Sequence, residues 1–132
     1  MKSLDLYSFI DATYKEKPLF LDYEGPLYLD DLNYYFNFND IVGKGLVLCL
    51  LENSKYSLAG YIGLMKCSDA LIIASQQLGI DKLGEILDRY RPSYIWLKNS
   101  QIDIFSEITA KTIFSFNGFT LLELSKNSFE IN

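Results

Sequence analysis

The chain reads LVLCLLENSKYSLAGYIGLMKCSDALII between residues 46 and 73, and this stretch decides the fold. It opens with six apolar residues in a row, too few for a stable helix and too unbroken for a strand with one solvated face. Residues 46–51 are therefore predicted to form a buried strand. Asn53 or Ser54 is expected to cap a helix over residues 55–67. A second apolar run, residues 70–74, completes a strand, helix and strand, expected to form a right-handed crossover with parallel strands.

The residues before this unit predict two helices, a hairpin and a turn. Residues 3–14 fit a short amphipathic helix, and residues 19–29 fit a β-hairpin bent at Glu24-Gly25-Pro26. Asp30 or Asp31 is expected to cap the next helix. The Gly-Lys-Gly triplet at residues 43–45 invites comparison with a phosphate-binding loop. It precedes a strand instead of following one, so a plain turn is favoured.

The residues after the unit predict another crossover and a second hairpin. Asp81 is expected to cap an amphipathic helix that Pro92 ends, and residues 94–97 are expected to form a third strand parallel to the first two. Trp96 in that strand is interpreted as a packing residue, with a stacking platform as the alternative. Residues 112–124 surround an Asn-Gly pair, which is the strongest short signal of a β-hairpin.

These elements together predict an α/β fold. We expect a small three-layer domain with a mainly parallel sheet built from βαβ crossovers, plus a β-hairpin near each end. At 132 residues the chain is expected to be a single domain, spanning residues 1–132.

The composition excludes several classes of function. The net charge is −5, with 12 basic and 17 acidic residues and no long basic cluster, so nucleic acid is not expected as a partner. The start has no signal peptide and no apolar run approaches the ~20 residues of a membrane span, so we expect a cytoplasmic protein without a membrane partner. Cys49 and Cys67 lack CxxC spacing and the chain has no histidine. They are interpreted as reduced structural thiols, with a disulfide or a metal site as the alternatives.

The chain is rich in aromatic residues, with 10 Tyr, 9 Phe and one Trp. Either the core is unusually aromatic, or part of this surface contacts a partner or another part of the protein. Gly60 and Gly63 lie within the predicted helix at residues 55–67, where each glycine costs about 1 kcal/mol in helix propensity. Close approach of another backbone is the expected compensation.

No catalytic constellation is visible in the sequence. The acidic residues Asp30, Asp31 and Asp69 each lie where a helix cap or a turn explains them. The absence of histidine excludes Ser-His and Cys-His catalysis and makes a zinc site improbable. We therefore assign no catalytic, cofactor-binding or metal-ligating residue.

Several short features occur in an order that matches a known superfamily. They are the run Leu-Tyr-Leu-Asp-Asp-Leu at residues 27–32, the Lys-Gly turn at 44–45, Asn53 near a helix start, Gly63 and Lys66 in that helix, and residues 85–87 with Pro92. In this order they resemble the beginning of an adenylate-forming acyl ligase, the superfamily of acyl-CoA synthetases, luciferases and nonribosomal peptide adenylation domains. The resemblance covers about residues 19–97. Leu46, Ser68 and Ile73 depart from the pattern, which indicates a divergent branch.

The resemblance implies that residues 1–132 are the N-terminal part of a larger adenylating domain that continues past residue 132. The predicted hairpin at residues 113–124 looks like the one that precedes the phosphate-binding loop of the family. The parent would be an AMP-dependent synthetase that uses ATP, Mg and CoA. The fragment would lack the ATP-binding loop, hold no cofactor and be inactive alone.

The function implied for the chain is the scaffold portion of an ATP-dependent carboxylic acid:thiol ligase. Such a ligase forms an acyl-adenylate and then transfers the acyl group to CoA or a carrier thiol. Its partners would be the remainder of the parent ligase and, for the isolated fragment, a second copy in a homodimer. The alternative is a free-standing α/β protein-interaction module. A small enzyme complete within 132 residues is a third hypothesis.

Overall fold

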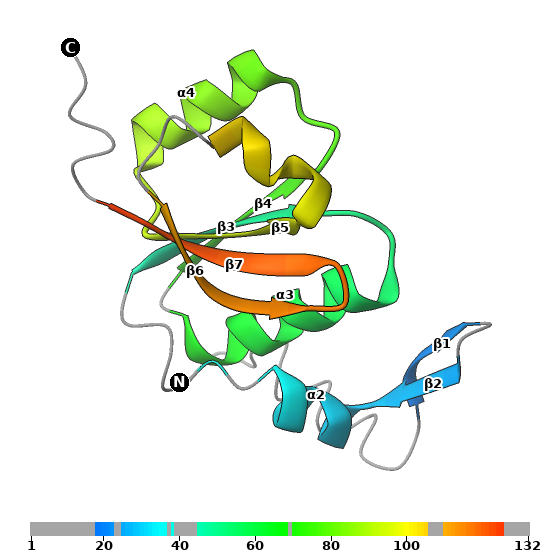
Figure 1. The fold of residues 1–132 in the computed structure, drawn as a ribbon. Helices are drawn as coiled ribbons and strands as arrows, with labels where there is room; N and C mark the ends of the chain where they lie inside the picture. Colours follow the sequence, from blue (N-terminus) through cyan, green and yellow to red (C-terminus); the bar gives the residue numbers. More distant parts are fainter. Residues whose placement is uncertain are drawn as a thin grey trace, which may run out of the picture.

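The computed structural model describes residues 18–22, 25–36, 38, 45–68, 70–105 and 110–125 of the chain. Its elements follow one another as β1 (Pro18–Asp22), β2 (Gly25–Tyr28), α2 (Leu29–Tyr35), β3 (Leu46–Leu51), α3 (Lys55–Cys67), β4 (Ala70–Ser75), α4 (Ile80–Tyr90), β5 (Tyr94–Lys98), the 3₁₀ helix η1 (Asn99–Phe105), β6 (Ala110–Phe116) and β7 (Phe119–Leu124) (Figure 1). The helix predicted over residues 3–14 lies outside the described residues.

The central sheet has five strands in the order β4-β3-β5-β7-β6, and it is mixed. β3 is parallel to both β4 and β5, whereas β7 is antiparallel to both β5 and β6. The prediction of a mainly parallel three-layer domain is therefore wrong. The C-terminal hairpin joins the sheet through β7, and a two-residue turn can connect only antiparallel strands.

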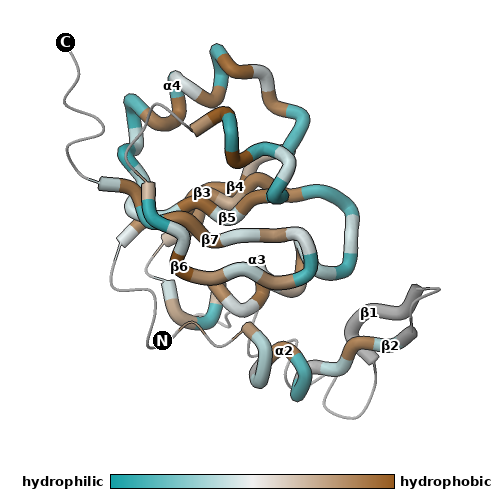
Figure 2. Tube along the Cα trace, in the orientation of Figure 1, coloured by the Kyte–Doolittle hydropathy of each residue, from teal (hydrophilic) through white to brown (hydrophobic). Residues whose placement is uncertain are grey.

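Apolar side chains on both faces of the inner strands explain this arrangement. Along β3, Val47 and Cys49 point to one face, and Leu48 and Leu50 point to the other. β5 and β7 are almost fully buried as well, which is typical of strands covered on both sides. Figure 2 shows hydrophobic colour along β3, β5 and β7. α3 covers one face, and α4 and η1 cover the other (Figure 1).

The core beneath α3 is aromatic. This α3-side core consists of Leu27, Leu32, Phe36, Phe38, Val47, Cys49, Ala59, Ile62, Leu64, Tyr94, Trp96, Phe119 and Leu121. The Trp96 ring is fully buried, 6.2 Å from the Phe36 ring and 5.8 Å from the Phe119 ring between centroids. Its Nε1–H donates a hydrogen bond to the carbonyl of Ser57 at 2.9 Å. Its interpretation as a packing residue is confirmed, which removes the stacking-platform alternative.

The core beneath α4 is aliphatic except for one ring. This α4-side core consists of Leu48, Leu50, Leu83, Leu87, Ile95, Leu97, Phe105, Leu122 and Leu124. β3, β5 and β7 contribute side chains to both cores, so the two cores share three strands.

The helix caps differ from those predicted at two of three places. Tyr28 is the N-cap of α2, and Asp31 lies in the first turn, where its carboxylate accepts a hydrogen bond from the Tyr28 N–H at 2.9 Å. Gly79, and not Asp81, precedes α4. Ser54 is the N-cap of α3, as predicted, although its side chain makes no capping hydrogen bond. Asp30, Asp31 and Asp81 lie in the first turns of their helices, where the positive end of the helix dipole stabilises a carboxylate.

Both predicted hairpins are present. β1 and β2 form a separate antiparallel pair. β6 and β7 are joined by Asn117 and Gly118, whose φ angles of 48° and 90° are both positive. A tight hairpin turn of this kind needs positive φ at both positions, which is why Asn-Gly is its strongest signal. The Asn99 N–H donates to the Gly118 carbonyl at 2.8 Å and ties the turn to η1.

Candidate functional site

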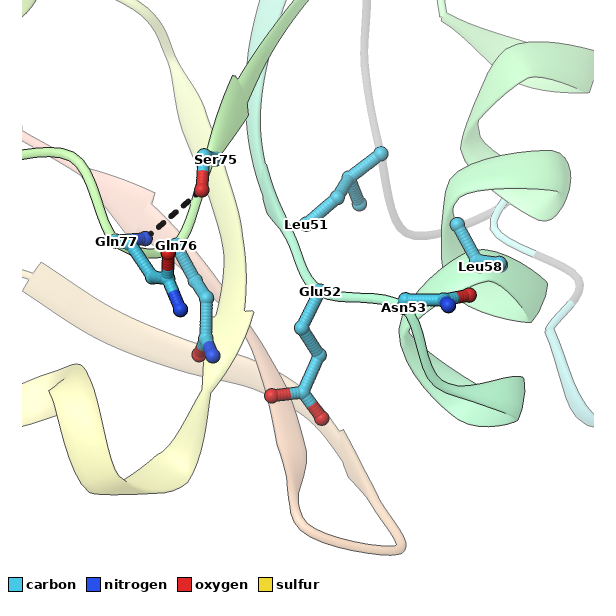
Figure 3. Close-up of a pocket in the computed structure, with 7 residues that line it drawn as sticks. All are labelled: Leu51, Glu52, Asn53, Leu58, Ser75, Gln76 and Gln77. Carbon is cyan, nitrogen blue, oxygen red and sulfur yellow. Dashed lines mark hydrogen bonds between the residues drawn. The ribbon is translucent and has the colours of Figure 1, made fainter.

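The candidate site lies at the carboxyl ends of β3 and β4, where the chain leaves the sheet toward opposite faces. β3 leads into α3 on one face of the sheet, whereas the neighbouring β4 leads into α4 on the other face (Figure 1). Ligands of open α/β sheets bind at such a point, outside the carboxyl ends of the strands. A cavity of about 460 Å³ lies here, lined by Leu51, Glu52, Asn53, Leu58, Ser75, Gln76 and Gln77 (Figure 3). We call it the carboxyl-edge pocket.

Backbone hydrogen bonds fix the side of the pocket that follows β4. The Gln76 N–H donates to the Leu51 carbonyl at 2.9 Å, which extends the ladder between β3 and β4 by one residue. The Gln77 N–H donates to Ser75 Oγ at 3.1 Å (Figure 3). The Gln101 side-chain amide, from η1, donates to the Gln76 carbonyl. The segment 75–77 is thus held by β3 and η1 together.

Glu52 is the one charged residue among the described residues that line the pocket. Its carboxylate lies 3.2 Å from Lys98 Nζ at the end of β5, and the Glu52 side chain is 18% exposed. Its N–H donates to Ser57 Oγ at 3.0 Å. The ion pair leaves this wall of the pocket close to electrically neutral. Lys98 is partly exposed, so the pair contributes at most about 1 kcal/mol to stability.

The chemistry of the lining suits hydrogen bonding more than catalysis. It offers amides, a hydroxyl and one carboxylate that is already paired with Lys98. Within the described residues there is no group of three His, Cys, Asp or Glu side chains that could hold a metal ion. The lining residues that the structure describes include no nucleophile paired with a base.

Gly45, the described residue of the Gly-Lys-Gly triplet, lies away from this pocket. Gly45 directly precedes β3, at the amino end of the strand, whereas the pocket lies at the carboxyl end. Lys44 and Asp69 lie outside the described residues, so the phosphate-loop comparison is not tested at its lysine.

Both cysteines are free thiols, as predicted. Cys49 is fully buried in the α3-side core, and burial raises the pKa of its thiol to about 12. Burial also raises the pKa of Cys67, whose Sγ lies 3.6 Å from the Gly63 carbonyl. Neither residue is a thiolate near neutral pH, so neither has the activated form that a nucleophile requires.

Sequence reasoning missed the residues that line the pocket beyond β4. The signal was present, because Ser75, Gln76 and Gln77 follow one predicted parallel strand and Glu52 and Asn53 follow its neighbour. The carboxyl ends of adjacent parallel strands meet at one edge of the sheet.

No described helix has both the length and the apolar character needed to cross a membrane. Comparison of the chain with protein-family models, with curated proteins and with solved structures finds no match.

Proposed function

We propose that this chain is the scaffold portion of an ATP-dependent carboxylic acid:thiol ligase of the adenylate-forming superfamily. The observation that carries the proposal is the order of elements: a hairpin, α2, the unit β3-α3-β4, α4, β5 and a second hairpin. The resemblance of the sequence to the superfamily implies the same order.

Two of the residues that carry the resemblance have structural roles that support the proposal. Gly63 lies where an added Cβ would be 2.4 Å from the Phe36 carbonyl oxygen, so only glycine fits. Asp31 accepts a hydrogen bond from the Tyr28 N–H at the start of α2. Local geometry therefore requires glycine at position 63 and favours a hydrogen-bond acceptor at position 31, where the resemblance expects them.

In this proposal the chain supplies rigid support, and the parent ligase supplies the reactive groups. Residues of the parent ligase beyond 132 would hold ATP, Mg and CoA. The remainder of the parent ligase would also be the principal partner of this chain. We place the protein in the cytoplasm, a location that the two free thiols favour.

The proposal is tested by reading the native transcript past the codon for Asn132. We expect the frame to continue into a Ser/Thr/Gly-rich loop followed by a lysine. A stop codon directly after Asn132, or a long continuation without that loop, would contradict the proposal. Titration of the isolated chain with Mg-ATP in a calorimeter gives a second test, because saturable binding would mean that the nucleotide site lies within this chain.

The second candidate is a free-standing interaction module, and exposed tyrosines favour it. Tyr34 is 79% exposed, and its ring packs against Tyr35 with 4.9 Å between the centroids. Tyr28 and Tyr35 are also exposed. Clusters of exposed aromatic residues often mark protein-binding surfaces. Immunoblotting of native extracts separates the candidates, since a module predicts a band near 15.2 kDa and a ligase predicts a much larger one.

A further inference from the structure

The two edge strands of the five-stranded sheet differ in how they are protected. β6 carries Lys111 and an irregular register between Thr112 and Phe114. Charged residues and bulges are the usual devices by which an edge strand avoids pairing with another chain. β4 reads Ala-Leu-Ile-Ile-Ala-Ser, without a charged residue or a proline, and it pairs with β3 over six residues in unbroken register. β4 therefore lacks each of these devices.

The side chains of β4 are also more exposed than those of β3, the strand beside it. Leu71 packs against the α3-side core, and Ile72 and Ala74 pack against the α4-side core. By alternation Ile73 faces the same side as Leu71. α3 packs over β3 and β5, and Ile73 remains 55% exposed. A large aliphatic side chain thus lies beside an open strand edge.

α3 adds an apolar surface on this face of the sheet. The helix has no charged residue between Lys55 and Lys66. Leu58 and Tyr61 lie in this interval and are only partly buried, although the outward face of a surface helix is normally polar. The absence of charge on β4 therefore continues onto the helix that covers the neighbouring strands on this face.

We propose that β4 pairs with β4 of a second copy of this chain. The two strands run antiparallel about a two-fold axis perpendicular to the sheet, and they join two five-stranded sheets into one. This inference does not rest on the proposed function.

A second copy offers β4 a partner edge with the same uncharged and unprotected sequence. Two copies that each carry a net charge of −5 repel one another over most of their surfaces. β4 is free of charge, so two copies that meet there bring no like charges into contact. A two-fold contact also requires a patch that complements itself. An open strand edge meets this requirement, because its backbone N–H groups can donate to the C=O groups of an identical antiparallel strand.

The test compares two single variants of the full 132-residue chain by sedimentation velocity over a series of concentrations. Ile73→Lys places a charge at the proposed contact, and Thr112→Lys places the same charge on the exposed β6 edge. We expect dimers for the unmodified chain and for Thr112→Lys. We expect Ile73→Lys to weaken the dimer by about 100-fold or more, because each copy then places a charged lysine at the contact.

A monomer at every concentration for the unmodified chain, or an undiminished dimer for Ile73→Lys, would overturn the proposal. A mass that keeps rising with concentration would also overturn it, since that behaviour requires contact between different surfaces. Hydrogen exchange of the unmodified chain is independent of any folding defect in a variant. We expect the amides of residues 70–75 to become more protected as the concentration rises, and unchanged protection would count against the pairing.

Discussion

Gly60 and Gly63 occupy the same helix but face different neighbours. An added Cβ at Gly63 would meet the Phe36 carbonyl oxygen, so another backbone approaches closely there, as the sequence predicted. At Gly60 the neighbour is a side chain, because an added Cβ would lie 2.1 Å from Trp96 Cζ2. The indole is buried among other rings and held by its hydrogen bond to Ser57, so it has little room to move.

Gly60→Ala is therefore expected to destabilise the protein by about 1–3 kcal/mol through overpacking against Trp96. Gly84→Ala is the matched control, because Gly84 also lies in a helix but has no atom within 4 Å of its added Cβ. That substitution is expected to stabilise the protein by about 0.5–1 kcal/mol. Urea unfolding followed by circular dichroism measures both changes. Equal effects of the two substitutions would contradict this account of Gly60.

Burial of Cys49 makes the free energy of unfolding depend on pH in the alkaline range. Its pKa is raised from 9.0 to about 12 in the folded protein, so the unfolded chain loses the thiol proton first. The stabilisation is complete below pH 9 and is lost as the pH rises toward 12. In this range the unfolding free energy should fall by up to about 1.4 kcal/mol more per pH unit than in Cys49→Ala. Urea unfolding at several pH values gives the two slopes, and identical slopes would refute the prediction.

The hairpin of β6 and β7 was predictable because its signal is local. Asn117 and Gly118 both adopt positive φ, and the sequence names the two residue types that tolerate it. The buried strand β3 was equally clear from six apolar residues in a row. The sheet type was not predictable, since residues 119–124 do not specify that β7 lies beside β5. The pocket was missed although the parallel pairing of β3 and β4 was predicted, because the polar residues that follow the two strands were not considered together.

Gly118→Ala is expected to destabilise the hairpin by about 1–2 kcal/mol, because a residue with a Cβ is strained at a φ of 90°. Asn117→Gly is the control, since glycine adopts positive φ without that strain. Thermal unfolding followed by circular dichroism should show a lower midpoint for Gly118→Ala and a nearly unchanged midpoint for Asn117→Gly. A Gly118→Ala protein as stable as the unmodified chain would mean that the turn can change type.

The whole molecule is organised around three strands shared by two cores. β3, β5 and β7 each place side chains in the α3-side core and in the α4-side core. Loss of packing in one core therefore destabilises the same three strands that form part of the other core. We expect the domain to unfold as one cooperative unit, which is usual for chains of this size.

Leu87→Ala tests this coupling, because Leu87 lies in the α4-side core and the single tryptophan lies in the other. The substitution should cost about 2–5 kcal/mol. The urea midpoints from Trp96 fluorescence and from circular dichroism should fall by the same amount. Leu64→Ala, in the α3-side core, is the comparison and should behave alike. A Trp96 midpoint that stays in place for Leu87→Ala would indicate two independent units.

The position of β7 has a consequence for synthesis on the ribosome. β5 is complete at Lys98, but the strand that covers its free side begins only at Phe119. While the intervening residues are emerging from the ribosome, the nascent chain presents β5 as an edge that β7 does not yet cover, and the side chains of both faces of β5 are ones that the folded protein buries. Such an intermediate is prone to aggregation. The time between emergence of Lys98 from the ribosome and emergence of Leu124 is therefore when a nascent-chain chaperone would protect this domain most.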